Sequence, residues 1–239
     1  MNSTINKKGT LYGIGIGPGD PELLTLKAAK AIENADIIYV PKSREQQSTA
    51  LNIVADFIPQ KASIIHLEFP MSHDINVRIN ARKENAKQIN NELNLGKQLV
   101  FLTLGDPMLY STYSYILEYI HPSHNIQTIP GIYSFAAISS IMSTPLVKGD
   151  EKLAVICTYD NTSQQLLNSV DTVVCMKVSG YSNELYNYLK NRCDYNFTMI
   201  TDAGKANQKT YNSIEVLTEA IPYFSTIIIQ NKKLNICQQ

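Results

Sequence analysis

The fold is decided by the stretch TLYGIGIGPGDPELLTLKA, which runs from Thr10 to Ala28. Residues 11–16 are apolar and include β-branched isoleucines, which predicts a buried strand, and the pattern breaks at the Gly-Pro-Gly of residues 17–19. Residues 22–33 then carry apolar side chains at helical spacing, behind a capping aspartate and a proline. A buried strand, a glycine-rich turn and a helix in this order predict the first unit of an α/β protein.

The same alternation of strands and helices continues along the chain. Further strands are predicted at residues 37–40, 63–67, 98–103, 125–129, 153–158, 172–177, 197–201 and 226–230. Further helices are predicted at residues 50–57, 75–93, 110–120, 133–142, 163–167, 183–191 and 214–220. Strands separated by helices indicate α/β sheets with right-handed crossovers. The break His121-Pro122-Ser123-His124 is the predicted linker, so we expect two α/β domains, at residues 1–122 and 123–239.

The composition excludes several classes of protein. Of 239 residues, 44% are hydrophobic and 18% are charged, which is ordinary for a globular protein and unlike a disordered chain. The 21 Lys and Arg residues balance 21 Asp and Glu residues, which disfavours a nucleic-acid partner held by many phosphate contacts. No apolar run approaches the roughly 18 residues of a membrane span, and no signal peptide opens the chain. We therefore expect no membrane partner and a cytoplasmic location.

The cysteines and histidines give no sign of a metal site. They are Cys157, Cys175, Cys193, Cys237, His66, His73, His121 and His124. No two cysteines form a C-x-x-C pair, and no two histidines lie four residues apart. Cys157 and Cys175 lie in apolar runs, which predicts buried, reduced thiols in a reducing compartment. We expect no protein-bound metal.

The first glycine loop, residues 13–20, does not match the common nucleotide-binding fingerprints. A dinucleotide site needs G-x-G-x-x-G at the helix start, whereas the third glycine here has the wrong spacing and Pro18 removes a backbone N–H. The second strand ends at Val40 and Pro41 without the acid that would bind ribose, and the Gly-Lys-Ser/Thr of a Walker loop is absent. Two alternatives remain for this loop: a close approach of the backbone to a ligand, or a tight turn without one.

Two more glycine loops follow strands. Residues 104–112 contain Gly105, Asp106 and Pro107, and residues 129–134 contain Pro130 and Gly131. Ligands of open α/β sheets bind at the carboxyl ends of the strands, where such loops lie. Asp106 can accept a hydrogen bond from an amine or a ribose, or it can cap the following helix. Each loop alone is a weak signal, but three in this order predict a ligand site.

With these three loops, the sequence resembles the tetrapyrrole methylase superfamily of S-adenosylmethionine-dependent methyltransferases. The matching motifs are Gly15-Ile16-Gly17-Pro18-Gly19-Asp20, Leu104-Gly105-Asp106-Pro107 and Pro130-Gly131-Ile132, and the resemblance covers residues 10–231. Leu104 stands where the wider family usually has a glycine. The resemblance implies the tetrapyrrole methylase fold, which has two α/β domains with the active site in the cleft between them. It also implies a homodimer.

Within this family, the sequence is most similar to the C20-methyltransferases of cobalamin biosynthesis. The segments that carry this similarity include Val40-Pro41-Lys42-Ser43, Tyr110-Ser111-Thr112, Pro145-Leu146, Gly149-Asp150-Glu151 and Met176-Lys177-Val178. The similarity implies methyl transfer to C20 of cobalt-factor II (cobalt-precorrin-2), with S-adenosyl-L-homocysteine as the second product. Metal-free precorrin-2, or another tetrapyrrole such as uroporphyrinogen III, is the alternative substrate. A composition rich in Asn, Ile and Lys without Trp favours the cobalt substrate, whose metal would arrive inside the tetrapyrrole.

The resemblance also assigns roles to individual residues. The cofactor-binding residues that it implies are Leu104, Gly105, Asp106, Leu109, Ser111, Thr112, Tyr133, Ser134, Met176, Lys177, Val178, Ala203, Gly204 and Thr226. Asp106 is the candidate catalytic residue, for steering or for accepting a proton, and a structural role is the alternative. Pro18 is expected where the macrocycle docks.

Cations should bind the eight carboxylates of the tetrapyrrole. We expect Lys42, Arg44 and Lys177 to do so, and solvated surface charge is the alternative. Arg78 and Arg82 lie one turn apart on a long helix, and for them an exposed helix face is the preferred interpretation.

Overall fold

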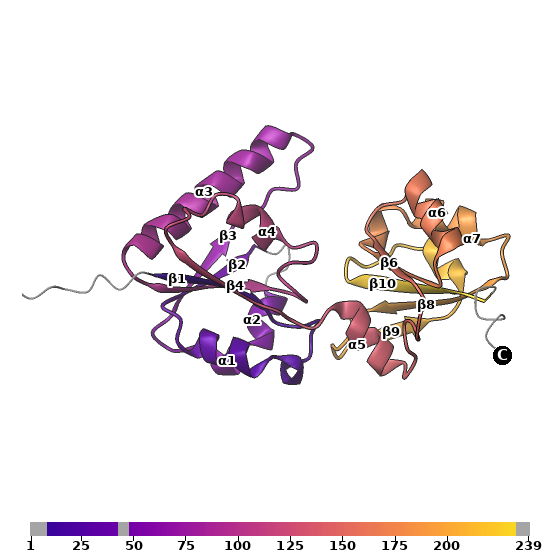
Figure 1. Cartoon of the computed structure of the whole chain (residues 1–239), viewed down its shortest axis with the longest axis horizontal. Helices are drawn as coiled ribbons and strands as arrows, with labels where there is room; N and C mark the ends of the chain where they lie inside the picture. Colours follow the sequence, from indigo (N-terminus) through magenta and orange to yellow (C-terminus); the bar gives the residue numbers. More distant parts are fainter. Residues whose placement is uncertain (1–8, 43–47, 233–239) are drawn as a thin grey trace, which may run out of the picture. The chain divides into compact units, whose positions relative to one another are not determined.

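Two five-stranded sheets organise the part of the chain described by the computed structural model, residues 9–42 and 48–232 (Figure 1). Each sheet belongs to its own compact unit, Met1–Tyr133 or Ser134–Gln239. The predicted α/β class is therefore confirmed for both halves of the chain.

The first sheet is parallel throughout and has the strand order β3-β2-β4-β1-β5. Its strands are β1 (Thr10–Gly15), β2 (Ile37–Pro41), β3 (Ser63–Leu67), β4 (Gln98–Thr103) and β5 (Asn125–Ile129). The helical segments are η1 (Pro21–Leu23), α1 (Leu26–Glu33), α2 (Thr49–Ile53), η2 (Ala55–Phe57), α3 (Ile75–Asn94) and α4 (Thr112–Leu117). Helices α1 and α2 cover one face of the sheet, and α3 and α4 cover the other (Figure 1).

Burial on both faces explains why four successive residues in the middle of β4 are apolar. In β4, Val100 and Leu102 pack towards α1 and α2, whereas Leu99 and Phe101 pack towards α3 and α4. All four side chains are fully buried. This is the pattern expected of a parallel strand covered by helices on both sides.

The first helix begins later than the sequence predicts. The predicted helix of residues 22–33 is divided into the 3-10 turn η1, capped by the Asp20 carboxylate, and the α-helix α1. Thr25 causes the division, because its hydroxyl accepts a hydrogen bond from the Ala28 amide at 3.2 Å and so starts a new helix. The glycine loop and η1 together therefore form a longer connection than predicted.

The boundary between the two units also differs from the predicted one. The sequence predicts that residues 125–129 belong to the second domain, but β5 pairs in parallel with β1, with Ile14 opposite Ile129, and completes the first sheet. The compact units accordingly divide between Tyr133 and Ser134 instead of after residue 122. The third glycine loop thereby belongs to the first unit.

The second sheet has the order β6-β7-β10-β8-β9 and is mixed. Its strands are β6 (Leu153–Ile156), β7 (Thr172–Met176), β8 (Tyr195–Thr201), β9 (Lys209–Tyr211) and β10 (Ser225–Asn231). Its helical segments are α5 (Ser134–Ile141), α6 (Asn161–Ser169), η3 (Val178–Gly180), α7 (Ser182–Leu189) and η4 (Ile214–Thr218). Within the second sheet, only β6 and β7 of the described strands pair in parallel, because β10 runs antiparallel to both of its neighbours and β9 runs antiparallel to β8. Strand β9 is absent from the sequence prediction.

Two buried tyrosines of the first unit give opposite predictions for stability. Burial raises the pKa of both the Tyr39 and the Tyr113 hydroxyl. The Tyr39 hydroxyl has no hydrogen-bond partner among the described residues. The Tyr113 hydroxyl, in contrast, lies 3.3 Å from Thr128 Oγ1. An unsatisfied buried hydroxyl destabilises the fold, so Tyr39→Phe should raise the free energy of unfolding by about 1 kcal/mol. Tyr113→Phe should lower it by about 1 kcal/mol. Urea unfolding of both variants measures the difference, and equal losses would contradict this prediction.

Candidate functional site

The three glycine loops meet at the carboxyl edge of the first sheet. They follow β1, β4 and β5, which are neighbours in the order β4-β1-β5 and run in parallel. Their carboxyl ends therefore lie side by side, as the sequence predicts for a ligand site.

Backbone hydrogen bonds join the first loop to the second. The Gly105 amide donates to the Gly17 carbonyl at 2.8 Å, and the Gly17 amide donates to the Gly105 carbonyl at 3.3 Å. Both residues have positive φ, +76° at Gly17 and +68° at Gly105. Glycine adopts this conformation without steric cost, which explains its presence at both positions.

Gly15, Gly105 and Gly131 pack so closely that no side chain fits between them. A Cβ atom on Gly131 would lie 2.1 Å from the Gly105 carbonyl oxygen and 2.7 Å from Gly15 Cα. A Cβ on Gly15 would lie 2.5 Å from the Gly131 amide nitrogen. These distances are far inside van der Waals contact, so the third loop is held directly against the other two.

Asp106 connects the second loop to the third. Its side chain is 5% exposed, and its two oxygens accept hydrogen bonds from the Met108 amide at 2.8 Å and the Gly131 amide at 3.0 Å. The alternative role as a helix cap is wrong, because Ser111 caps α4 by accepting from the Tyr113 amide at 3.0 Å. The geometry makes Asp106 a residue that positions the loops, and its catalytic role stays a prediction.

The other predicted cofactor residues of the first unit lie on these same loops. Leu104, Gly105, Leu109 and Thr112 are half-buried, and Tyr133 is exposed. Ser111 is buried, with its hydroxyl 3.3 Å from that of Thr103 at the end of β4. The loops therefore offer mainly peptide groups and short hydroxyls to a ligand.

The predicted residues of the second unit gather at one edge of the second sheet. Thr226 lies opposite Met176 in the register of β10 and β7, and the Ser134 hydroxyl lies 3.4 Å from that of Thr226. Lys177 follows Met176 with φ +56° and is exposed, whereas Val178 is fully buried.

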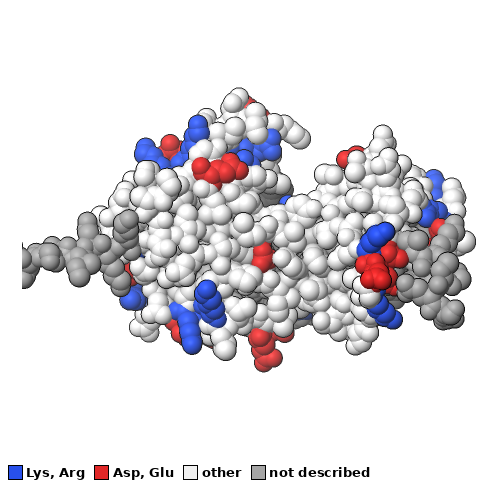
Figure 2. Space-filling view, in the orientation of Figure 1, with Lys and Arg blue, Asp and Glu red and all other residues white. Residues whose placement is uncertain are grey.

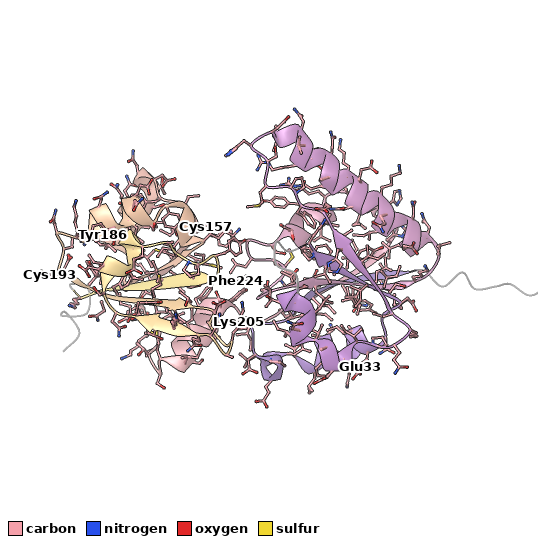
Figure 3. All side chains as sticks on the ribbon, turned by 180° about the vertical axis from the view of Figure 1, so that it is seen from behind. Glu33, Cys157, Tyr186, Cys193, Lys205 and Phe224 are labelled. Carbon is pink, nitrogen blue, oxygen red and sulfur yellow. The ribbon has the colours of Figure 1, made fainter. Side chains whose placement is uncertain are left out.

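The loop after β8 carries Ala203 and Gly204 and is fixed by contacts that the sequence did not predict. Lys205 Nζ lies 2.9 Å from Asp202 Oδ1 and 3.9 Å from the centre of the Phe224 ring. Figure 3 shows the Lys205 and Phe224 side chains close together. The ion pair and the cation–π contact hold the loop on the segment that leads into β10. No residue spacing in the sequence signals this arrangement.

The residues predicted to bind the substrate lie in different parts of the chain. Lys42 forms an ion pair with Glu68 at the end of β3, so an acid of its own unit already neutralises it. Arg44 lies outside the described residues. Pro18 is half-buried in the first loop, and Lys177 belongs to the second unit. On the face shown in Figure 2, blue and red side chains are interspersed, without a wide basic surface.

Two further observations concern metals and membranes. Within residues 9–42 and 48–232, no group of three or more His, Cys, Asp or Glu side chains is arranged to hold a metal ion. In the same part of the chain, no helix combines the length and the apolar character needed to cross a membrane.

A comparison with known families decides the classification. A model described as Tetrapyrrole (Corrin/Porphyrin) Methylases matches residues 10–217. The chain belongs to the tetrapyrrole methylases. The family match begins at β1 and ends within η4, so it includes all three glycine loops.

Similar tetrapyrrole methylases span nearly the same length. The cobalt-precorrin-2 C(20)-methyltransferase of Salmonella typhimurium is 33% identical over 233 residues, which are 94% of this chain and 97% of that protein. A probable cobalt-precorrin-2 C(20)-methyltransferase of Methanocaldococcus jannaschii is 34% identical over 211 residues, 87% of this chain and 88% of that protein.

Solved structures confirm the fold. A cobalt precorrin-4 methyltransferase has a TM-score of 0.73 at 19% identity and covers 92% of this chain and 94% of its own. The uroporphyrin-III C-methyl transferase of Thermus thermophilus, solved with S-adenosyl homocysteine, has a TM-score of 0.65 at 18% identity. The match covers 95% of this chain and 100% of the Thermus chain. The roles of individual residues stay predictions.

Proposed function

We propose that this tetrapyrrole methylase transfers a methyl group from S-adenosyl-L-methionine to C20 of cobalt-precorrin-2, as in cobalamin biosynthesis. The observation that carries the proposal is the joining of the three family motif loops around Gly105. The substrate follows from the two relatives of 33% and 34% identity, both named for cobalt-precorrin-2. A homodimer and a cytoplasmic location are part of the proposal.

The loops of the first unit fit this cofactor. In the direction of an absent Gly105 side chain, the nearest atom is the Ile132 carbonyl oxygen at 3.9 Å, so the Gly105 backbone is open to a ligand. The Asp106 carboxylate accepts from one amide of the second loop and one of the third, and the Ser111 hydroxyl caps α4, which leaves peptide groups and the Thr112 hydroxyl as contacts. Neutral groups of this kind suit a cofactor that carries its own ammonium and carboxylate.

When bound, the cofactor supplies an electrophilic methyl group. We assign its binding to Leu104, Gly105, Asp106, Leu109, Ser111, Thr112, Tyr133, Ser134, Met176, Lys177, Val178, Ala203, Gly204 and Thr226. The meso carbon of an electron-rich tetrapyrrole is already nucleophilic, so the main task of the protein is to position it. Positioning of two reactants supplies about 7–11 kcal/mol in favourable cases. Rigid loops, locked by Asp106 and the interlocked glycines, serve this task.

Metal-free precorrin-2 is the alternative substrate. The precorrin-2 C(20)-methyltransferase of Sinorhizobium sp covers 94% of this chain but is only 25% identical. The higher identity to the two cobalt-precorrin-2 enzymes supports the cobalt substrate.

The deciding experiment offers cobalt-precorrin-2, precorrin-2 and uroporphyrinogen III separately to the protein with ¹³C-methyl-labelled cofactor, without oxygen. We expect one labelled methyl group at C20 by NMR and the highest kcat/KM for cobalt-precorrin-2. Reactions without tetrapyrrole control for hydrolysis of the cofactor. Label at another carbon, or no transfer to any of the three tetrapyrroles, would refute the proposed function.

A further inference from the structure

Arg78 and Arg82 lie in the first turns of α3, at the same edge of the first sheet as the three glycine loops. Strand β3 runs parallel to the other strands and ends at Leu67, and α3 begins at Ile75 after a short connection. The start of α3 is therefore at the carboxyl edge, where ligands of α/β sheets bind. Both arginines are half-buried, so the exposed helix face that the sequence predicts for them is wrong.

Arg78 has a buried donor without an acceptor. Its Nε atom is inaccessible to solvent and has no hydrogen-bond partner among the described residues. The nearest acid along the helix, Asp74, caps α3 by accepting from the Asn76 amide at 2.8 Å and forms no ion pair with Arg78. A guanidinium in this state destabilises the fold unless a ligand supplies an acceptor.

Arg82 is held in place by an aromatic ring. Its guanidinium carbon lies 3.7 Å from the centre of the Tyr115 ring, and no carboxylate of the described residues lies within ion-pair distance. Tyr115 belongs to α4, the helix that Ser111 caps at the end of the second glycine loop. Stacking orients a guanidinium and leaves the N–H groups at its edge available for a planar acceptor such as a carboxylate.

Two other cations of this unit are paired with acids, and two exposed methionines lie in loops at the same edge of the sheet. Lys42 pairs with Glu68, and Lys97 pairs with Glu92. In the segments that follow β3 and β4, Met71 and Met108 are 78% and 60% exposed. Exposed apolar side chains and guanidinium groups without an acid partner at one edge of a sheet suit a ligand with an apolar ring and carboxylates at its periphery.

We propose that Arg78 and Arg82 bind a peripheral carboxylate of the tetrapyrrole and so orient it against the second glycine loop. This inference rests on the proposed function, because it takes the tetrapyrrole as the substrate. Arg78 contributes its guanidinium charge and, once its side chain turns toward the ligand, the Nε–H that has no acceptor among the described residues. Arg82 contributes the edge of its stacked guanidinium.

The test compares Arg78→Met, Arg82→Met and Lys83→Met. Lys83 is exposed on the same helix, so its variant removes one positive charge without touching the two arginines. Titration with cobalt-precorrin-2 should give dissociation constants that rise roughly tenfold to a hundredfold for each arginine variant. S-adenosylhomocysteine binding, measured by calorimetry, should not change, and Lys83→Met should behave as the unmodified protein. Arg78→Lys should recover part of the affinity, because it keeps the charge without the planar donors.

Thermal unfolding separates a substrate contact from a structural role. Arg78→Met removes an unsatisfied donor, so its melting temperature should be equal to or above that of the unmodified protein, whereas a structural arginine would lower it. Unchanged tetrapyrrole affinity in both arginine variants overturns this inference alone. An unmodified protein that binds S-adenosylhomocysteine but no tetrapyrrole overturns the proposed function as well.

Discussion

Gly131→Ala is expected to reduce methyl transfer on the order of a hundredfold and to lower the free energy of unfolding by about 3 kcal/mol. The new Cβ would lie 2.1 Å from the Gly105 carbonyl oxygen and 2.7 Å from Gly15, and all of these atoms are backbone. Backbone cannot rotate away as a flexible side chain can, so the third loop has to move off the other two. Displacement of about 1 Å in a positioning site is enough for a loss of this size.

Gly180→Ala is the matched control for this variant. Neither glycine has a positive φ, and a Cβ at Gly180 meets no atom within 4 Å, so Gly180→Ala introduces a methyl group without the clash. Steady-state kinetics and thermal unfolding of both variants make the comparison. If Gly131→Ala retained the activity of Gly180→Ala, the close packing of the three loops would not be required for catalysis.

The meeting of the three loops could be predicted from the sequence because it depends on local signals. Each loop follows an apolar strand, and carboxyl ends of parallel strands share an edge. The place of β5 could not be predicted in this way. The break at residues 121–124 is a surface turn, in which the His124 amide donates to the His121 carbonyl at 3.0 Å, and it does not separate domains. A turn between a helix and a strand and a linker between domains have the same composition.

The other differences between the sequence predictions and the structure come from contacts between residues that are distant along the chain. Lys42 lies 26 residues from Glu68, and Asp106 lies 25 residues from Gly131, so no spacing rule connects them. The exposed face that the sequence predicts for the start of α3 is wrong for a related reason. Its buried residues, Asn85, Ala86, Ile89 and Leu93, lie in its second half. Hydrophobic periodicity therefore gives no information about which face of the first turns is covered.

Asp106→Asn is the second substitution with a large expected effect. The two carboxylate oxygens each accept one amide N–H, from Met108 and from Gly131. An asparagine has only one side-chain oxygen, so in either orientation its NH₂ group faces the amide N–H of Met108 or of Gly131 and cannot accept from it. Losing a charge-assisted hydrogen bond in a buried site should lower the free energy of unfolding by about 1.5–3 kcal/mol. The activity should fall roughly tenfold to a hundredfold, because the third loop loses its anchor.

Asp36→Asn provides the control, and stability measured beside activity separates the two roles of Asp106. Asp36 accepts one amide N–H, from Gln98 at 2.8 Å at the opposite edge of the sheet, and an asparagine oxygen can accept it equally well, so both stability and activity should stay close to those of the unmodified protein. If Asp106 positions the loops, Asp106→Asn loses stability together with activity. If Asp106 accepts a proton in the reaction, the variant instead loses activity while its stability changes little. A variant as stable as the unmodified protein but without activity would therefore overturn the positioning role.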